Sequence, residues 1–311
     1  MNNTQLLVSK VEMSQSNIRL DRVSALLFPQ YSRTKIKNFI INCQVKVNNQ
    51  YIINPKKKMK GGEIIEITIN EKNYNIKFKK TDLNIIYEDQ DLFIINKPSG
   101  LVVHPGCKNK NHTLLNIILS HYPDLKYLKR SGIVHRLDKN TTGLMIIAKT
   151  YVAQNLLCKA LKKRKIKREY RAIVHGNIIY HGTINAPIAR DKYFKTRMKI
   201  SIDGKLATTH YQVIKNFAQY TYIKLYLETG RTHQIRVHMA HIQHPIVGDT
   251  KYIDQKKIHY YNPLLNINRH ALHARKITFI HPIKNIFMQL KINIPEDMRI
   301  LIKNLIKLNK K

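Results

Sequence analysis

The segment SGIVHRLDKNTTGLMIIAKT (131–150) places a dense polar turn between two apolar stretches that are typical of strands. Asp138 lies in this turn between Arg136 and Lys139, in a chain that has few acids. A polar hairpin loop with Asp138 as a turn former is the plainest interpretation. The neighbouring cations favour the ionised carboxylate. An ionised carboxylate suits a nucleophile or a stabiliser of an oxocarbenium ion, and does not suit a general acid.

The chain around this segment shows many strand patterns and few helical ones. In YTYIKLYLE (220–228), Ile223, Leu225 and Leu227 alternate with other residues, which is the period of a half-buried strand. Because strands outnumber helices and do not alternate with them, residues 83–311 are predicted to form one α+β domain around a mixed, mainly antiparallel sheet. Strands are expected at 83–87, 92–96, 143–148, 169–174, 208–214, 220–228, 276–280 and 287–292, helices at 113–122, 152–164, 231–243 and after Pro295, and a surface loop at 252–270.

A smaller unit is predicted at 17–75, followed by a linker at 76–82. It should contain two helices, the second capped by Ser32, and a hairpin around Asn48 and Asn49. Its basic residues form either a solvated helix face or a face that contacts phosphates. These residues are Arg33, Lys35, Lys37, Lys56, Lys57 and Lys58.

The composition indicates a polyanionic partner. The 311 residues include 55 Lys and Arg against 19 Asp and Glu, for a formal charge of +36. Such a chain repels itself when compact, and nucleic acid or an anionic membrane relieves that repulsion. AT-rich codons also raise the lysine count, so the position of the basic residues is more informative than their number. The sequence shows no transmembrane run, no secretory signal and only three scattered cysteines, so a cytoplasmic protein is expected.

The sequence contains no motif for a nucleotide, a metal or an organic cofactor: GxGxxG, Walker A and HExxH are all absent. His233, His238, His241 and His244 lie close in sequence, but their spacing scatters them around a helix, which is a poor arrangement for metal ligands. Neither a metal nor a cofactor is therefore expected.

Two long motifs resemble the RluA-type pseudouridine synthases. They are GIVHRLDKNTTGL (132–144) and LETGRTHQIRVHMAHIQHPIVGD (227–249). Further matches follow in the family's order at YEDQDLFIINKPSGLVVHP (87–105), REYRAIVHG (168–176) and ALHA (271–274). The smaller unit resembles the S4-type RNA-binding module over 19–40, 44–49 and 58–67. That likeness implies that its helices and hairpin bind an RNA backbone through their basic face.

The resemblance implies an isomerisation that breaks the C1′–N1 bond of uridine, turns the base and forms a C1′–C5 bond, without redox change, cofactor or metal. Asp138 would be the catalytic residue, acting either by addition at the ribose or through a glycal. Arg136 would fill the gap left by the flipped base, and His135 beside it would position the substrate. Tyr170 would stack on the flipped uracil and assist proton removal from C5. Arg231 would pair with Asp138. The plainer alternatives are a core tyrosine for Tyr170 and a phosphate contact for Arg231.

Within the family, the residues of these motifs are most similar to those of members that act on the large ribosomal subunit. The resemblance implies a monomeric enzyme, with 23S rRNA or a precursor of that subunit as partner and the helix 69 stem-loop as target. Two alternatives stay open: an S4-bearing member that modifies other 23S rRNA uridines, and a non-catalytic rRNA-binding assembly factor. A methyltransferase or synthetase linked to an S4 module would need motifs that the sequence lacks.

Overall fold

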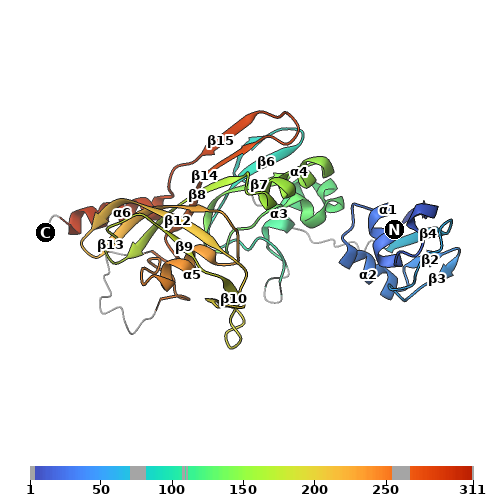
Figure 1. Cartoon of the computed structure of the whole chain (residues 1–311). Coiled ribbons are helices and arrows are strands. Elements are labelled where there is room, and N and C mark those ends of the chain that lie inside the picture. The colour runs from blue at the N-terminus through green and yellow to red at the C-terminus, as the bar shows by residue number, and fades with distance from the viewer. Residues whose placement is uncertain (1–3, 71–81, 107–108, 110, 254–266, 310–311) are drawn as a thin grey trace. The chain divides into compact units, whose positions relative to one another are not determined.

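The structure is a computed structural model that describes residues 4–70, 82–106, 109, 111–253 and 267–309. The chain divides into two compact units (Figure 1). Unit 1 is drawn from residues 1–80 and 119–132, and unit 2 from residues 81–118 and 133–311. The predicted linker at 76–82 lies outside the described residues except for Asp82, and so does most of the loop expected at 252–270.

Unit 1 carries a four-stranded antiparallel sheet in the order β1-β4-β2-β3. Ser32 caps the second helix as predicted, because its Oγ accepts the N–H of Lys35 at 3.2 Å. Asn48 and Asn49 turn the predicted hairpin, both with positive φ. The elements are β1 (Thr4–Lys10), α1 (Leu20–Leu27), α2 (Arg33–Ile41), β2 (Val45–Val47), β3 (Gln50–Tyr51) and β4 (Ile64–Asn70), with short 3-10 helices at Met13–Gln15, Pro123–Tyr127 and Lys129–Gly132.

Strand β1 was not expected from the sequence. It pairs with β4 from its first residue to its last. Leu6 and Val8 are exposed, while Leu7 packs on the core between them. This strand lies at the sheet edge, and its short run of mixed residues gives only a weak periodic signal. The sheet of unit 1 therefore begins ahead of residue 17, where the predicted unit starts.

Apolar residues at helical spacing hold the helices of unit 1 on its sheet. Leu20 and Val23 on α1, and Ile36 and Ile40 on α2, are fully buried in one cluster with strand residues. Burial of each such side chain contributes about 1.5–3 kcal/mol. The opposite face of α2 is left to polar and basic residues.

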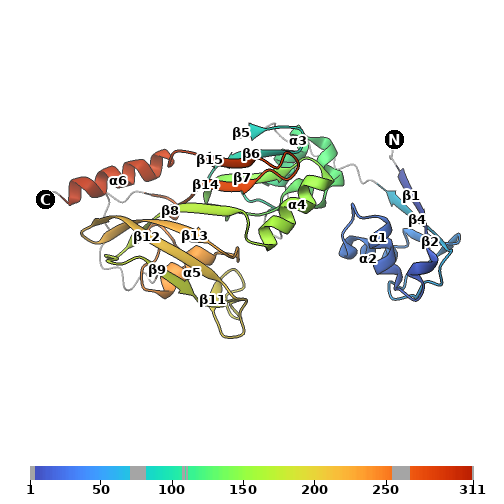
Figure 2. The same cartoon turned by 45° about the horizontal axis from the view of Figure 1, so that its top comes forward.

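Unit 2 is built on a nine-stranded sheet, and the α+β fold class predicted from the sequence is confirmed. The strand order is β5-β6-β7-β14-β8-β13-β12-β9, with β15 paired to β14. All neighbouring strands are antiparallel except β7 and β14. Helix α4 contacts β7, and α5 contacts β12 and the separate β10–β11 hairpin (Figure 2). The strands are β5 (Ile85–Glu88), β6 (Leu92–Lys97), β7 (Thr142–Ala148), β8 (Lys167–His175), β9 (Gly182–Asn185), β10 (Ile188–Arg190), β11 (Met198–Ile200), β12 (Thr208–Phe217), β13 (Tyr220–Leu227), β14 (Leu272–Ile280) and β15 (Phe287–Lys291). The helices are α3 (Leu114–His121), which begins in unit 2, α4 (Tyr151–Lys162), α5 (Gln234–His241) and α6 (Glu296–Leu308).

The parallel contact between β7 and β14 depends on Gly143. This residue has φ of 117°, and a Cβ built on it would lie 2.2 Å from the carbonyl oxygen of Ala274. A side chain cannot occupy that space, so only glycine lets the two backbones approach this closely. The approach brings the polar turn before β7 next to β14, whose other neighbour is β8.

Among the described residues, no helix has both the length and the apolar character that a membrane crossing requires.

Candidate active site

Asp138 lies in the turn that precedes β7 and is held by an arginine on α5. Its Oδ2 accepts a hydrogen bond from Nη1 of Arg236 at 3.0 Å. The same guanidinium binds Asp249 through Nε at 2.7 Å and Nη2 at 2.9 Å. The Asp138 side chain is 15% exposed, whereas the Asp249 side chain is 1% exposed. The two carboxylates raise the pKa of Arg236 against the effect of its burial, so the cation stays charged.

Arg236 occupies the place that the sequence predicted for Arg231. Arg231 is exposed in the segment before α5, and its Nε donates to the carbonyl oxygen of Leu206 at 3.1 Å. Arg236 lies inside the helix, on a face that is buried. The prediction that Arg231 pairs with Asp138 is therefore wrong in this structure. A role of Arg231 in catalysis stays a prediction.

His233 and Tyr252 complete the surroundings of Asp138. Nε2 of His233 lies 3.9 Å from Oδ1 of Asp138, and its Nδ1 lies 2.6 Å from the hydroxyl of Tyr252. Burial lowers the pKa of His233 to about 4, so the ring is neutral near pH 7. The ring of Tyr252 lies under the guanidinium of Arg236, 5.0 Å from the ring centre, and its hydroxyl accepts the N–H of Met198. This tyrosine connects β11 to the site.

Lys97 supports the turn that holds Asp138. The sequence did not single out this residue. Its side chain is fully buried, and its Nζ donates to the carbonyl oxygens of Pro98, Leu101 and Lys139 at 2.7–3.0 Å. Burial lowers its pKa to about 7, while the charge of Asp138 acts in the opposite direction. Because Lys139 follows Asp138 directly, this ammonium anchors the backbone of the turn.

Tyr170 lies on β8 and is 5% exposed. Burial raises its pKa, with Arg168 opposing and the charge of Asp138 adding to the shift. The phenol therefore stays protonated near neutral pH. Tyr170 is paired with Ala274 on β14, and Ala274 is paired in turn with Gly143 at the start of β7, so the register brings Tyr170 and the turn of Asp138 to either side of β14.

The two other residues predicted in the turn differ in environment. Arg136 is exposed. His135 is turned toward the sheet, where its Nε2 accepts the N–H of Ile146 at 3.0 Å. Burial lowers the pKa of His135 to about 3, so the ring stays neutral. His135 thus holds the turn on β7 through Nε2. Its part in positioning the substrate stays a prediction.

The predicted RNA-binding residues of unit 1 are not equivalent. Arg33 pairs with the buried Asp21 at 2.8 Å, and Arg19 pairs with the same carboxylate at 3.0 Å. Arg33 therefore shares one carboxylate with a second arginine inside the unit, while the other predicted residues have no such ion pair among the described residues. Lys35 lies over the ring of Phe39 and is exposed. The remaining predicted lysines, Lys37, Lys56, Lys57 and Lys58, are exposed as well.

Three of the four clustered histidines, His233, His238 and His244, form hydrogen bonds within the fold. His238 contacts Thr209 through Nδ1 and the carbonyl of Ala186 through Nε2, and Nδ1 of His244 contacts the carbonyl of His175. Another group, Asp89, Asp91 and His281, has metal-like spacing. There the carboxylate of Asp89 is already paired with Lys284 at 2.9 Å and with Nε2 of His281 at 2.9 Å.

Comparison with known proteins agrees with this geometry. Residues 91–241 match the family model described as RNA pseudouridylate synthase. The chain is 45% identical over 299 residues to "Ribosomal large subunit pseudouridine synthase D" of Yersinia pestis, and 44% identical over 300 residues to the protein of that name in Escherichia coli K12. Each alignment covers 94% of this chain and 92% of the relative.

Two solved structures share the fold. Human RNA Pseudouridylate Synthase Domain Containing 4 aligns with a TM-score of 0.58 and 24% identity over 71% of this chain and 92% of its own. Human RNA Pseudouridylate Synthase Domain Containing 1 aligns with a TM-score of 0.54 and 23% identity over 68% of this chain and 83% of its own.

Proposed function

The chain belongs to the RluA-type family of RNA pseudouridine synthases, and from this membership we propose that it isomerises uridines in the helix 69 stem-loop of 23S rRNA. The relatives that carry the name of a large-subunit synthase align with it nearly end to end. We further propose that it acts as a cytoplasmic monomer on 23S rRNA or a precursor of the large subunit, through unit 1 as an S4-type module at about 17–75 and a catalytic domain at about 83–311.

The observation that carries the proposal is the carboxylate of Asp138, which Arg236 binds at one oxygen while the other oxygen has no hydrogen bond to His233. Arg236 binds Oδ2, whereas Oδ1 lies 3.9 Å from the nearest nitrogen of His233, which is too far for a hydrogen bond. Oδ1 therefore keeps its lone pairs for the ribose. A neutral His233 adds no second positive charge that would weaken this oxygen as a nucleophile.

The target uridine must leave its stack to reach Asp138, at a cost of a few kcal/mol. Arg136, exposed on the turn, fills the gap with a planar guanidinium that stacks and donates hydrogen bonds. Asp138 then either adds to C1′ as the C1′–N1 bond breaks, or takes a ribose proton and leaves a glycal. In both routes the freed uracil turns and C5 bonds to C1′.

Tyr170 stacks on the turned uracil at the bottom of the site. Since its phenol stays protonated, it assists the loss of the C5 proton through hydrogen bonding and does not act as a phenolate base. The proton lost from C5 and the proton gained by N1 balance, so the reaction uses no cofactor. Arg231 is proposed as a substrate contact at the exposed rim of the site.

The test is to map pseudouridines in total rRNA from cells with the gene, without it, and with the gene carrying Asp138→Asn. Wild type should restore pseudouridine in the helix 69 loop, and Asp138→Asn should not, because an amide cannot act as a nucleophile. Purified Asp138→Asn should bind the stem-loop within a few-fold of wild type. Modification at other 23S positions only would favour the alternative target, and turnover by Asp138→Asn would remove Asp138 from the mechanism.

A further inference from the structure

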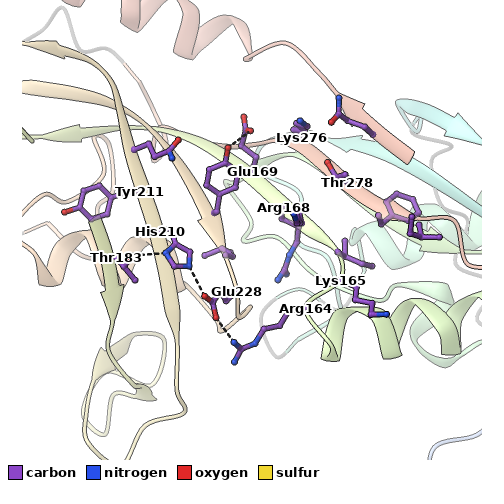
Figure 3. A pocket seen from close by; sticks show the side chains of 18 of the residues that line it. Arg164, Lys165, Arg168, Glu169, Thr183, His210, Tyr211, Glu228, Lys276 and Thr278 are labelled. Carbon is purple, nitrogen blue, oxygen red and sulfur yellow. Dashed lines mark hydrogen bonds and ion pairs between the residues drawn. The ribbon is translucent and has the colours of Figure 1, made fainter. Parts of the chain in front are cut away.

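Unit 2 has a groove that the proposed reaction does not use. Its volume is about 1050 Å³. Strands β8, β12, β13 and β14 contribute to it together with β9, β15 and the segment that follows α4 (Figure 3). Most of the residues that line it are polar or charged.

The groove lies on the face of the sheet opposite Tyr170. Glu169 on β8 is paired with Lys276 on β14 and with Tyr226 on β13, and Tyr226 is paired in turn with His210 on β12. Residues paired in register share one face, so these four side chains form a row along the groove. Tyr170 is the next residue along β8, and neighbours in a strand point to opposite faces. The row is therefore separated from Tyr170 by the sheet itself.

The two acids of the groove are already paired. Glu228 accepts hydrogen bonds from His210 at 2.9 Å and from Arg164 at 2.5 Å, as Figure 3 shows. Glu169 pairs with Arg171 at 2.9 Å. These contacts balance the negative charges of the groove without using its lysines.

Three lysines of the groove remain uncompensated. Within the described part of the chain, the ammonium groups of Lys165, Lys167 and Lys276 have no carboxylate partner at ion-pair distance. They come from the segment after α4, from the start of β8 and from β14. Three cations of this kind around one groove favour a ligand with several negative charges spaced along its length.

Apolar and aromatic groups lie beside these cations. Phe287 on β15 is 67% exposed, and its cross-strand partner Ile280 is 51% exposed. Tyr226 contributes its ring to the floor and donates its hydroxyl to Glu169 at 3.2 Å. The exposed ring of Phe287 beside these lysines fits a single-stranded nucleic acid, in which a base stacks on the ring while the phosphates meet the cations. An acidic peptide would not use the ring in this way.

We propose that this groove binds a single-stranded RNA segment of the substrate outside the target nucleotide, with Lys165, Lys167 and Lys276 at its phosphates and Phe287 under one of its bases. This inference rests on the proposed function for the identity of the RNA. It adds a second contact surface on the sheet face away from Tyr170, so RNA that reaches both faces must pass around an edge of unit 2.

The test compares two sets of three lysine-to-glutamine substitutions in the full chain. The groove set is K165Q, K167Q and K276Q, and the control set removes equal charge at the exposed Lys159, Lys303 and Lys307. RNA affinity is measured across salt concentrations on a helix 69 stem-loop with and without single-stranded flanks. Arg168 also lines the groove but is left unchanged, because its charge acts on Tyr170.

With the flanked RNA, the groove set should reduce the steepness of the plot of log binding constant against log salt concentration by about 2. Each phosphate of single-stranded RNA that no longer meets a lysine removes roughly 0.7 from this slope. It should behave like the control set on the stem-loop without flanks. F287A should weaken binding of the flanked RNA about fivefold or more and leave the salt slope unchanged. Turnover at saturating RNA should stay within twofold of wild type both for the groove set and for F287A.

Equal slopes for the groove and control sets would overturn the inference, and so would competition by a polyglutamate peptide as effective as that by single-stranded RNA. The double variant K165Q and K167Q changes only exposed lysines, so it repeats the test without altering the half-buried Lys276. Wild-type turnover is measured on the same RNA. Its absence would count against the proposed function alone, because the salt slopes report binding directly.

Discussion

Arg236 is the residue on which the geometry around Asp138 depends. One guanidinium serves two carboxylates, and the second, Asp249, is almost completely buried. Removal of one partner from such a buried pair leaves a charge without compensation, which costs about 3–5 kcal/mol. The arginine thus stabilises the fold and orients the carboxylate of Asp138 at the same time.

Arg236→Lys should lower the free energy of unfolding by about 2 kcal/mol or more and reduce turnover strongly, because an ammonium cannot bind both carboxylates in the forked geometry. Arg231→Lys is the matched control, with the same change five residues earlier on an exposed side chain. It should leave the unfolding transition unchanged. Circular dichroism during urea titration and turnover on the stem-loop measure both effects. A larger loss of stability in Arg231→Lys would contradict the assignment of the pair.

Lys97 makes the stability of the protein depend on pH. The pKa of a lysine side chain in an unfolded chain is about 10.4, and burial lowers the pKa of Lys97 to about 7 in the folded chain. Between these values the unfolded chain holds a proton that the folded chain has lost, so raising the pH favours folding across this window. The cost of burying the ammonium is fully present below pH 7 and disappears as pH rises through about 7 to 10.

Lys97→Met removes this titration. The free energy of unfolding of wild type, minus that of Lys97→Met, should therefore rise by about 1 kcal/mol per pH unit between roughly pH 7 and 10. The variant also leaves three carbonyl oxygens without their donor, so it should be less stable than wild type at about pH 9. Urea titrations at several pH values give both quantities. A difference that does not change with pH would mean that Lys97 titrates elsewhere.

At the scale of elements, the contact between β7 and β14 positions the turn that holds Asp138. Gly143 has a positive φ and no room for a Cβ, and the turn with Asp138 ends just before it. The neighbouring hydroxyls of Thr141 and Thr142 bond to His270 and His273 at 2.8 Å, which closes the same junction. Gly143, near the end of the segment GIVHRLDKNTTGL, is thus required for a structural reason, because two backbones meet at this position.

Gly143→Ala should destabilise unit 2 by about 3 kcal/mol or more, because the added methyl group meets backbone that cannot move without breaking the ladder. Gly106→Ala is the control, since a Cβ there would meet nothing within 4 Å. Thermal unfolding followed by circular dichroism measures the difference, and turnover at low temperature shows whether the remaining folded protein keeps its site. An unchanged midpoint for Gly143→Ala would mean that the strands can separate at no cost.

At the scale of the whole molecule, unit 1 is expected to supply affinity, and unit 2 the chemistry. Asp138, Tyr170 and Arg236 all belong to unit 2. Unit 1 carries exposed lysines on α2 and in the segment before β4. Because residues 119–132 also belong to unit 1, substitutions test this division more cleanly than deletion of residues 1–75.

Glutamine at Lys35, Lys37, Lys56, Lys57 and Lys58 should weaken RNA binding and lower the log–log salt slope by roughly 0.7–0.9 for each phosphate that these side chains neutralise. Turnover at saturating RNA should stay within a few-fold of wild type. The control set at Lys159, Lys303 and Lys307 should change the slope less. Equal slopes would mean that these lysines reflect composition and not binding. Loss of turnover at saturating RNA would mean that unit 1 takes part in forming the site.

The sequence by itself determined the features that depend on local pattern. Alternating apolar residues predicted strands such as β13, Ser32 predicted the cap of α2, and the polar turn drew attention to Asp138, whose catalytic role stays a prediction. These features follow from the period of a strand, from the four unpaired N–H groups of a helix start, and from a charge pattern within a few residues. The motifs in their order also identified the family.

Tertiary structure decided which of the candidate side chains meet. Arg231 and Arg236 share one motif, and only the packing of α5 selects the second as the partner of Asp138. His135 was turned to the sheet by the N–H of Ile146, and Lys97 was brought under the turn by carbonyl oxygens up to 42 residues away. Strand β1 exists through its pairing with a strand more than fifty residues later. The physical reason is common to all four: each has at least one partner more than ten residues away, so burial and hydrogen-bond satisfaction in the folded chain determine the outcome.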